Sequence, residues 1–559
     1  MHCLFLTYTN QNRMRCFIIF MTFFLSFSLQ AQMADSPKLV VGIVVDQMCY
    51  EYLYRYEPKF CENGFRTFLE KGTNCRNTLY NYVPTYTGPG HASIYTGAVP
   101  ADHGIVGNEW FERESGQLIN CVDDNTVQPV GTTSVDGKCS PKNLKTYTIS
   151  DQLKLTYPGA KVISMSIKDR GAILPGGHLS DGTYWYDYET GRFITSSFFE
   201  PQLPDWVDRL NKEGQVDRYM SGTWNTLLDI SAYAESGPDD SPYEVLLPGK
   251  STPTFPYDLK AMSAIGSKYQ LFTTTPHANT LLTELAIRSI EPENLGKDGQ
   301  TDLLCISYST PDIAGHAFGP YSVELEDVYI RLDLELGRLI KSLEEKVGKD
   351  QFIIFLTADH AVVPVPKFLT DKKMPGGYLY INDYLKNLEA SVKQKFGVDL
   401  ILAEENQNIY LDHSRMDSLG IERTEVADFI AIQIGKWPGV KRSYTFKEIE
   451  LPGSDDGWRD MIKRGYHPAE SGDVIFILEP GYLLKSVETL SSHKGTSHGS
   501  AFNYDTHVPL LWYGKGIPEM QLIRPINITD IAATLTHLLY LQRSGAMTGQ
   551  PIEELFDAR

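Results

Sequence analysis

The sequence predicts an α/β protein, a three-layer α/β/α sandwich with a mostly parallel central sheet. Five short segments are near-continuously apolar, which is typical of strands buried on both faces, as in parallel sheets. Segments with a helical pattern separate most of these strands, and such helices cover both faces of a parallel sheet. The predicted strands are residues 38–45, 161–167, 302–307, 351–357 and 508–512.

Length and composition support a large globular domain and argue against one class of partner. The chain has 559 residues, of which 42% are hydrophobic and 22% charged, so it has ample apolar material for a large core. Its formal net charge is −19. Nucleic-acid binding requires a basic surface that neutralises phosphates, and we therefore expect no nucleic-acid partner.

The first 31 residues have the pattern of a signal peptide. Arg13 and Arg15 precede an apolar run over residues 16–29, and a small-residue cleavage region ends at Ala31. A membrane anchor is the alternative, but the apolar run is shorter than the about 20 residues that a spanning helix needs. We expect export, cleavage of residues 1–31 and no stable membrane anchor.

The first predicted strand, 38–45, ends at Asp46, and a helical segment follows to about residue 71. Open α/β sheets place their functional sites at the carboxyl ends of parallel strands. Asp46 is therefore a candidate site residue, and a helix-cap or turn carboxylate is the alternative.

The stretch 82–110, YVPTYTGPGHASIYTGAVPADHGIVGNEW, joins a strand to a helix. A strand-like run over 77–83 leads to Thr87, where Gly-Pro-Gly at 88–90 predicts a turn before a helix that begins at about His91. A hydroxyl at a helix N-terminus faces free backbone N–H groups and the positive end of the helix dipole, which favours an anion or an oxygen nucleophile. Taken alone, the pattern fits an ordinary threonine cap equally well.

The strand 161–167 runs directly into Lys168 and Arg170. If the extended conformation continues, both side chains point to one face, where two cations can hold phosphate oxygens; a solvated surface pair is the alternative. The flanking regions look less regular. Residues 112–143 are too polar for the core, and residues 176–269 are expected to form an irregular insertion that covers the edge of the sheet.

Two further strand ends carry side chains that bind metals. After the third predicted strand, Asp312 and His316 are four residues apart, a spacing that brings two ligands to one side of a helical turn. The fourth predicted strand ends in the adjacent pair Asp359 and His360. Both pairs are expected at the same edge of the sheet as Asp46.

Residues 361–490 form a second predicted insertion, after which the core resumes near residue 491. There His498 and His507 flank a loop that precedes the last predicted strand. The helices predicted in this half of the chain and before it are 277–289, 322–346, 382–396, 422–434 and 529–539.

Six cysteines remain after the predicted leader, and an exported location permits disulfides. Cys61 with Cys75 and Cys121 with Cys139 are near enough in sequence to pair, although connectivity cannot be deduced from spacing. Cys305 lies in an apolar run and is expected to be a buried thiol. The sixth, Cys49, has no assigned partner.

One property unites the candidate residues: nearly every one lies at or just beyond the end of a predicted buried strand. Carboxylate and imidazole ligands in this mixture suit Zn²⁺. Three carboxylates, three imidazoles and one alkoxide suffice for two ions, and two ions about 4 Å apart stabilise both the attacking and the leaving oxygen of an in-line displacement. The seven residues are Asp46, Thr87, Asp312, His316, Asp359, His360 and His498.

The order D…T…DxxxH…DH…H, with VPTYTGPGHASIYTG around Thr87 and GTSHG near the end, resembles the alkaline phosphatase superfamily. The likeness covers essentially the whole chain after the leader. Threonine at the nucleophile position, the downstream GxxGNxW and the strand-end KDR are similar to the PafA-type periplasmic alkaline phosphatases. The resemblance implies one periplasmic catalytic domain over 36–559, with insertions at about 176–270 and 361–490.

The resemblance also implies two Zn²⁺ ions and a set of catalytic roles. Thr87 would be the nucleophile, phosphorylated in a covalent intermediate. Asn108 would donate its amide to a phosphoryl oxygen, while Lys168 and Arg170 would hold the oxygens that a monoester leaves free. One zinc would be held by Asp312, His316 and His498, and the other by Asp46, Asp359 and His360, with Thr87 Oγ beside it.

The expected function is hydrolysis of small-molecule phosphate monoesters with broad specificity, by a protein expected to be a monomer. Two cations at the non-bridging oxygens favour the more highly charged monoester over a diester. The alternatives are a nucleotide pyrophosphatase/phosphodiesterase of the same superfamily and a metal- or phosphate-binding protein without turnover. A sulfatase would need Cys or Ser in place of Thr87. His91 and His507 are expected outside the ligand set.

Overall fold

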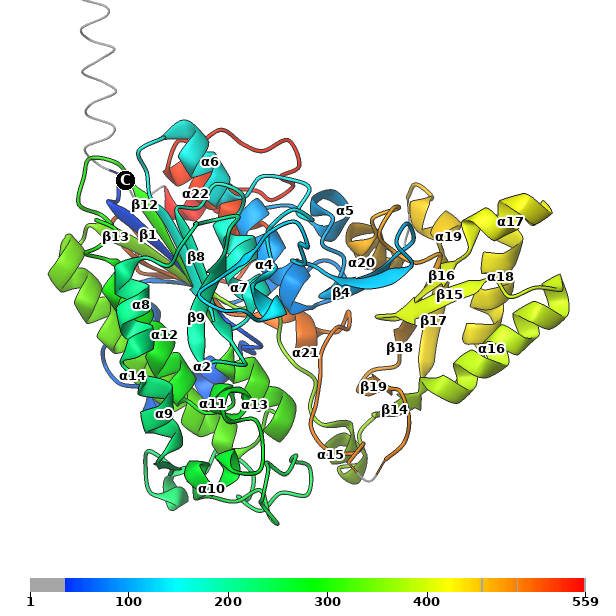
Figure 1. Cartoon of the computed structure of the whole chain (residues 1–559), viewed down its shortest axis with the longest axis horizontal. Coiled ribbons are helices and arrows are strands. Elements are labelled where there is room, and N and C mark those ends of the chain that lie inside the picture. The colour runs from blue at the N-terminus through cyan, green and yellow to red at the C-terminus, as the bar shows by residue number, and fades with distance from the viewer. Residues whose placement is uncertain (1–35, 454–455, 490, 557–559) are drawn as a thin grey trace, which may run out of the picture.

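The centre of the protein is a ten-stranded mixed sheet, seen edge-on and tilted in Figure 1. The computed structural model describes residues 36–453, 456–489 and 491–556, so the leader predicted over 1–31 lies outside the described residues. The strands, in sheet order, are β22 (Met520–Leu522), β2 (Thr73–Cys75), β21 (Leu510–Gly514), β13 (Phe352–Thr357), β1 (Leu39–Val45), β12 (Asp302–Tyr308), β7 (Val162–Ser166), β8 (Gly182–Asp187), β9 (Arg192–Ser196) and β6 (Pro129–Val130).

The middle of this sheet is parallel, as the apolar runs predict. Strands β13, β1, β12, β7 and β8 are neighbours and pair in parallel. Antiparallel strands continue the sheet on either side, with β21 beside β13 and β9 beside β8. Every residue of β1, β12 and β13 is buried, because helices cover both faces of these strands.

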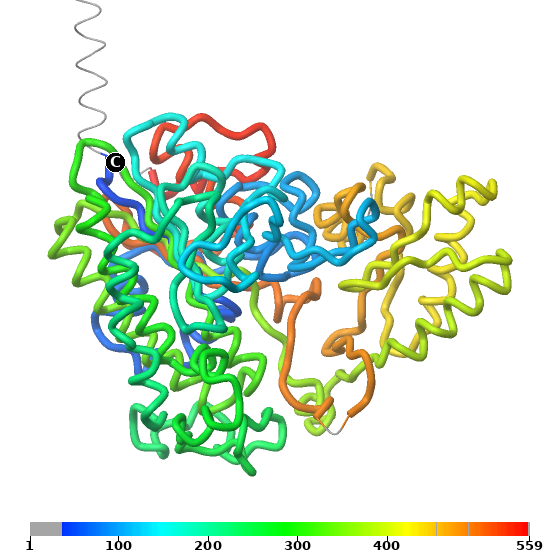
Figure 2. Tube along the Cα trace, viewed as in Figure 1, coloured from blue at the N-terminus to red at the C-terminus, as the bar shows by residue number. Residues whose placement is uncertain are grey.

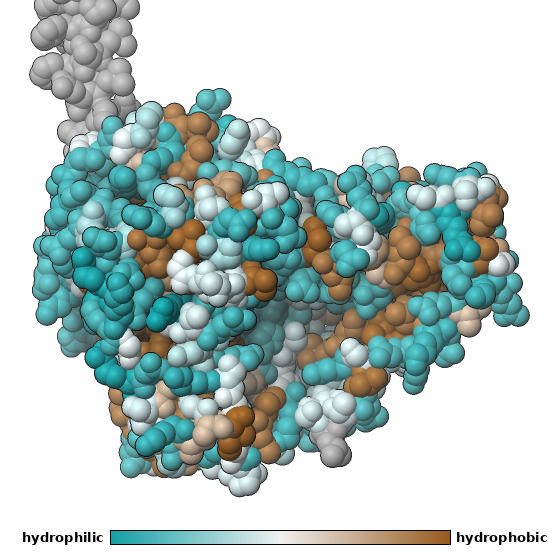
Figure 3. Space-filling model, in the orientation of Figure 1, coloured by the Kyte–Doolittle hydropathy of each residue, from teal (hydrophilic) through white to brown (hydrophobic). Residues whose placement is uncertain are grey.

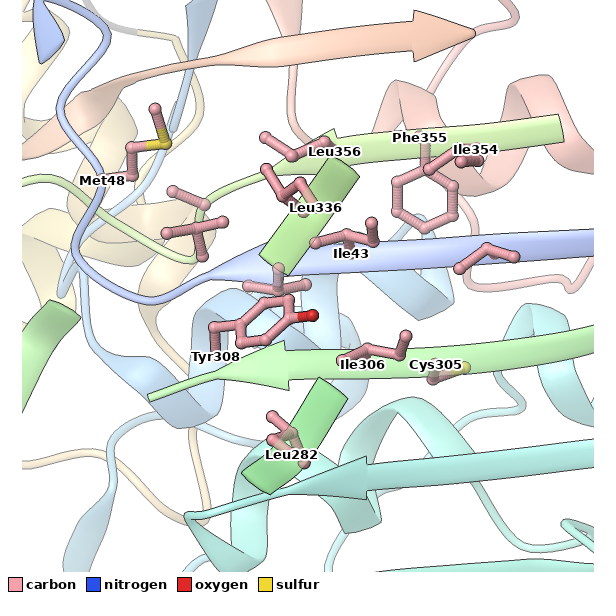
Figure 4. Close-up of a cluster of buried hydrophobic side chains, with 14 of the residues drawn as sticks. Ile43, Met48, Leu282, Cys305, Ile306, Tyr308, Leu336, Ile354, Phe355 and Leu356 are labelled. Atoms are coloured by element: carbon pink, nitrogen blue, oxygen red, sulfur yellow. The ribbon is translucent and has the colours of Figure 1, made fainter. Parts of the chain in front are cut away.

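Helices form a layer on each face of the sheet, which confirms the predicted sandwich (Figures 1 and 2). Figure 4 shows how one layer packs: Ile43 of β1 and Ile306 of β12 lie beside Leu336 of α14 and Leu282 of α12. That layer contains α3 (Phe65–Lys71), α12 (His277–Ser289) and α14 (Val323–Leu343). The opposite layer contains α4 (Thr87–Thr96), α6 (Ile149–Thr156), α7 (Asp169–Gly176) and α22 (Asp530–Leu538).

The prediction of irregular structure over 176–269 is wrong for the first part of this segment. Residues 182–187 and 192–196 form β8 and β9, which extend the central sheet. The sequence GTYWYD of β8 is wholly buried, but its core is aromatic and not aliphatic, so it lacks the Val/Ile-rich run of the other strands. The rest of the segment holds short helices, α8 (Asp205–Lys212), α9 (Gln215–Met220), α10 (Leu259–Ser263) and α11 (Lys268–Thr273).

The polar region 112–143 also contributes to a core, contrary to the prediction. Cys121, Val122 and Cys139 are buried with Trp110 and Ile173 in a small apolar cluster beside α4 and α7. The hairpin of β4 (Glu109–Glu112) and β5 (Gln117–Asn120) leads into this cluster. A few buried residues scattered among polar ones give no apolar run, which is why the sequence pattern does not reveal them.

The second predicted insertion contains a separate lobe, which we call the insert lobe and define as residues 377–485 (Figure 1, right). Its helices α16 (Ile381–Phe396) and α18 (Arg423–Ile434) confirm the two predicted there. They cover a four-stranded sheet with a core of its own. Figure 3 shows the surface hollowed where the lobe meets the body. The strands are β15 (Ile401–Glu405), β16 (Asn408–Leu411), β18 (Val474–Leu478) and β17 (Val440–Thr445).

All six cysteines of the described residues are free thiols, so neither pair named from the sequence is bonded in this structure. Cys305 is buried, as predicted. Among the described residues, we find no helix that combines the length and apolar character needed to cross a membrane. The limits of the catalytic domain and its insertions stay predictions.

Candidate active site

The carboxyl ends of the parallel strands meet at one edge of the sheet and carry the predicted site residues. Asp46 follows β1, and Asp359 and His360 follow β13. Helix α13 (Thr310–Phe318), which begins two residues after β12, carries Asp312 and His316. His498 arrives from the loop before β21. This is the edge at which open α/β sheets place their sites.

Thr87 is the first residue of α4, so the helix begins four residues earlier than predicted. The backbone N–H groups in the first turn of a helix have no intrahelical acceptor, so a proline in this turn removes no intrahelical hydrogen bond. Pro89 is therefore compatible with a helix that begins at Thr87. The flanking glycines allow close approach: a Cβ at Gly90 would lie 2.3 Å from the carbonyl oxygen of Asp359. The helix can thus bring Thr87 close to the end of β13.

The first predicted ligand group is assembled in the structure. Nε2 of His316 and Nε2 of His498 lie 3.1 Å and 3.7 Å from Oδ1 of Asp312. All three ligand atoms lie within 4.8 Å of one another. Ligand atoms held about 2.0–2.1 Å from one tetrahedral Zn²⁺ are roughly 3.3 Å apart, so the spacing fits such an ion.

The second predicted group is brought together around His360, although the triad whose atoms share one common spacing is Asp46, Asp312 and His360. Nε2 of His360 lies 3.5 Å from Oδ1 of Asp46 and 3.6 Å from Oδ2 of Asp359. These three atoms are buried, and none has a hydrogen-bond partner among the described residues. Buried polar atoms are normally paired, so three orphaned atoms that converge fit a bound cation. Asp312 also lies within ligand distance of Asp46 and His360.

Hydrogen bonds on the outer side of each imidazole fix the orientation of the three histidines. Nδ1 of His316 lies 2.8 Å from the carbonyl oxygen of Thr496, and Nδ1 of His498 lies 2.8 Å from that of Thr85. Nδ1 of His360 lies 3.0 Å from the carbonyl oxygen of Ala361. A carbonyl can only accept, so Nδ1 carries the proton and Nε2 is left with a lone pair that faces the site.

The site contains more negative than positive charge. Burial, with the neighbouring charges of Asp312 and Asp359, raises the pKa of Asp46 to about 7. Burial also raises the pKa of Asp359 to about 6 and lowers that of His360 to about 4. Three buried carboxylates with the single ammonium of Lys168 among them leave an excess of negative charge, which divalent cations would compensate.

Lys168 and Arg170 are placed differently from the prediction. The extended conformation does not continue past β7, because Lys168 is the N-cap of α7 and Arg170 is already helical. Lys168 Nζ lies 2.7 Å from Asp46 Oδ2, 2.5 Å from Asp312 Oδ2 and 3.4 Å from Thr87 Oγ1. Arg170 is mostly buried nearby, where the charge of Asp46 contributes to its raised pKa. The surface-pair alternative is therefore wrong for Lys168.

The side chain of Asn108 contacts the N-terminal end of α4. Its Oδ1 accepts a hydrogen bond of 2.7 Å from the backbone N–H of Gly88. This bond fixes which end of the amide faces the helix and leaves the NH₂ group free to donate. The arrangement agrees with the donor role that the sequence resemblance implies.

Sequence reasoning missed Gln47. Its Nε2 donates to Asp312 Oδ1 over 2.5 Å, and its backbone N–H donates to Asp359 Oδ1 over 3.1 Å, so it links one residue of each ligand group. Gln47 has a φ of 66°, an uncommon conformation for a residue other than glycine. A Cβ at Gly315 would lie 2.0 Å from Gln47 Oε1, so a larger residue there would displace the Gln47 amide. The sequence offers no signal for this role beyond adjacency to Asp46.

The remaining histidines of the motif regions lie outside the ligand groups. His91 is buried between the carbonyl oxygen of Thr87, 2.9 Å from Nδ1, and the hydroxyl of Ser307, 2.8 Å from Nε2. His507 lies 2.9 Å from the carbonyl oxygen of Arg76 and stacks on Tyr50. The contacts of His507 are structural, whereas Nδ1 of His91 also lies 3.4 Å from Asp359 Oδ2, so His91 lies directly behind the second ligand group.

A cavity of about 330 Å³ opens beside His498. Tyr86 and Ser500 line it on the side of the body, and the turn at 404–407, between β15 and β16, lines it on the side of the insert lobe. Tyr86, which precedes Thr87, and His498 place this cavity next to the ligand groups.

Comparisons with known proteins show the family of the chain. Residues 40–501 match the family described as type I phosphodiesterase / nucleotide pyrophosphatase. The chain is 41% identical to "Alkaline phosphatase PafA" of Elizabethkingia meningoseptica, over 93% of this chain and 94% of that one. It is 40% identical to a protein of Myroides odoratus named "Calcium-transporting ATPase", over 96% and 97% of the two chains.

A crystal structure of wild-type alkaline phosphatase PafA has the same fold. It superposes with a TM-score of 0.88 at 40% sequence identity, and the match covers 93% of this chain and 99% of that one. Both the sequence match and the fold match extend over nearly the whole length of the two chains. The chain belongs to the type I phosphodiesterase / nucleotide pyrophosphatase family of the alkaline phosphatase superfamily, and within it to the PafA-type alkaline phosphatases.

Proposed function

We propose that the protein is an exported, zinc-dependent alkaline phosphatase that hydrolyses phosphate monoesters through a phosphothreonine intermediate. The observation that carries the proposal is the position of Lys168 Nζ. It lies 3.4 Å from Thr87 Oγ1 and is hydrogen-bonded to one carboxylate of each ligand group. A cation at this point meets a phosphoryl oxygen as Thr87 attacks. The relatives named alkaline phosphatase PafA support the same reaction.

The donor set, nitrogen and oxygen ligands in both groups, suits zinc, and the printed distances from His316 to Asp312 and from His360 to Asp46 and Asp359 are near tetrahedral spacing. When bound, two zinc ions would favour the ionised form of the Thr87 hydroxyl and neutralise charge on the leaving oxygen. We assign one ion to Asp312, His316 and His498 and the other to Asp46, Asp359 and His360.

The protein residues then perform a two-step displacement. The Thr87 hydroxyl gives its proton to solvent, Oγ forms a bond to phosphorus while the ester P–O bond breaks, and the leaving alkoxide takes a proton from solvent. Lys168, Arg170 and the amide of Asn108 hold the non-bridging oxygens, so their donors are in place before charge shifts in the transition state. Water then attacks the phosphothreonine, which releases inorganic phosphate and restores the Thr87 hydroxyl.

The assigned groups all face the phosphoryl end of the substrate, which supports broad specificity. The cavity beside His498 would receive the rest of the ester. Its walls include segments far apart in the sequence, among them those around Tyr86, the 404–407 turn and Ser500. A substrate is therefore selected first by its phosphate.

The competing activity is phosphodiester or pyrophosphate cleavage, which the family description names. The test compares kcat/KM for an aryl phosphate monoester and for the matching diester, with the zinc-loaded protein. We expect a strong preference for the monoester, because a diester carries one negative charge fewer and has an ester group where Lys168 or Arg170 would bind oxygen. A preference for the diester would reject the proposal, and hydrolysis of neither would support a binding protein.

Loss of the Gln47 amide should weaken metal retention. In Gln47→Leu, Asp312 loses a hydrogen-bond donor, and residues that orient metal ligands typically contribute about 10–100-fold to metal affinity. We expect a drop of that size, measured as zinc retained during dialysis against a graded chelator. The backbone bond to Asp359 remains, so Gln47→Glu, which replaces the donor with a negative charge, should be worse than Gln47→Leu. Equal retention in all three proteins would show that Gln47 does not support the ligands.

A further inference from the structure

A second buried acidic cluster lies outside the candidate active site. Glu324 is the second residue of α14 and has no exposed surface, and Glu244, from the loop before β11 (Tyr257–Asp258), is 1% exposed. The reaction assigned above uses neither residue. Buried carboxylates are costly unless they are paired, so each needs a partner.

The neighbouring acids of α14 have such partners. Glu326 accepts from Lys59 Nζ over 2.6 Å and from Ser236 Oγ over 2.6 Å. Asp327 accepts from Trp224 Nε1 over 2.8 Å, among other donors. The same turn of the helix therefore shows how this protein satisfies a buried acid when it uses its own side chains.

Glu244 and Glu324 are satisfied only in part. Tyr257 Oη donates to Glu324 Oε1, but Oε2 of Glu324 and Oε2 of Glu244 are both buried without a hydrogen-bond partner among the described residues. Lys494 is the nearby cation, yet its Nζ bonds to the backbone carbonyl of Glu244, 2.9 Å away, and not to the carboxylate. The pair therefore has two unpaired oxygens and no countercharge in contact.

The charge of Glu324 acts on Glu244. Burial, followed by the charge of Glu324, raises the pKa of Glu244 to about 10, and burial raises the pKa of Glu324 to about 8. Such a pair is stable either with a proton shared between the carboxylates or with a cation that compensates both charges. The two orphaned oxygens belong to two different carboxylates.

We propose that Glu244 and Glu324 bind a hard divalent cation, Ca²⁺, at a site separate from the zinc ligands. All donors here are oxygens, from the two carboxylates and the adjacent hydroxyl of Ser241, with no histidine or cysteine to favour zinc. Carboxylates and water suit Ca²⁺, which accepts irregular geometry more readily than Mg²⁺ does.

The site would brace the loop that supports the candidate active site. The segment around Glu244 is hydrogen-bonded to two segments that carry or orient His316. The backbone N–H of Val245 donates to the carbonyl of Ala317, and the backbone N–H of Gly495 donates to the carbonyl of Tyr243. Ala317 follows His316, and Gly495 precedes Thr496, whose carbonyl orients His316. A cation at Glu244 would fix these elements together.

Terbium luminescence tests the site directly, because Tb³⁺ occupies Ca²⁺ sites and is excited by nearby aromatic rings. Tyr257 touches Glu324, and Trp224 stacks on Tyr257 with ring centroids 5.3 Å apart. In the zinc-loaded protein we expect saturable Tb³⁺ emission that Ca²⁺ displaces and Mg²⁺ displaces poorly. Glu324→Gln and Glu244→Gln should each weaken the apparent affinity at least tenfold.

Glu200→Gln is the matched control, since Glu200 is a half-buried carboxyl that accepts from Tyr184 Oη in the same way but lies elsewhere. It should leave the emission unchanged. If the wild type gave no saturable emission, or if the two glutamine variants bound Tb³⁺ as tightly as the wild type, the cation site would be overturned. The two carboxylates would then be stabilised by a shared proton. Circular dichroism of each variant separates loss of binding from loss of fold.

Discussion

Replacing Thr87 by alanine should lower kcat for a phosphate monoester by about 10⁴-fold or more, because loss of a covalent nucleophile usually removes nearly all turnover. Thr87 Oγ1 is the hydroxyl that the start of α4 presents to Lys168 Nζ, 3.4 Å away. The measurement is release of inorganic phosphate from an aryl phosphate by zinc-loaded enzyme. Thr87→Ser keeps the hydroxyl and should retain much of the activity.

Thr85→Ala is the matched control for this change. Thr85 lies two residues away and is also buried, but its hydroxyl bonds to the carbonyl of Ser500 over 3.0 Å. Its carbonyl, which orients His498, is kept in the alanine variant, so we expect a loss of less than about tenfold. Acid quench during turnover should trap phosphate on the wild-type chain and none on Thr87→Ala. A Thr87→Ala enzyme with a tenth of the normal rate would exclude Thr87 as the nucleophile.

The parts of the site that the sequence revealed share one physical origin. Asp46 and Asp359 each follow a continuously apolar run, and such runs are readable because parallel strands are buried on both faces. Once the strands are known, the edge of the sheet brings their ends together. The ligand groups are therefore predictable as a set, although the chain separates Asp46 from His498 by hundreds of residues.

The features that the sequence did not reveal depend on local backbone geometry or on tertiary contacts. Gln47 supports two ligands because the chain turns with φ of 66° after β1, and no residue pattern marks that turn. At the start of α4, Gly90 packs against Asp359 and Gly88 against Gly107, and in the sequence alone both glycines indicate a turn. Strand β8 was missed because its buried side chains are aromatic, and the position of Arg170 because the chain becomes helical directly after Lys168.

The second large effect is expected from removing the cations of Lys168 and Arg170. In the Lys168→Ala, Arg170→Ala double variant, kcat/KM for the monoester should fall by about 10³-fold or more, since one donor aimed at developing charge contributes about 10²–10³-fold. For the diester, kcat/KM should fall by about tenfold or less, because a diester carries one negative charge fewer and has one non-bridging oxygen fewer for these cations to bind. Kinetics with both substrates give the ratio of the two losses, which is the decisive quantity.

Lys168 has a second role that this experiment must separate. Its Nζ contacts Asp46 and Asp312, so the variant also changes the charge around the ligand groups. Arg170 forms an ion pair with Asp169, which is not a predicted ligand, and Arg170→Ala alone therefore tests the substrate contact with the zinc content unchanged. If Arg170→Ala reduces monoester hydrolysis selectively, the cations select the substrate by its charge. If kcat/KM falls equally for both substrates and the variant also loses zinc, Lys168 and Arg170 maintain the metal site. Substrate selection must then lie in the cavity beside His498.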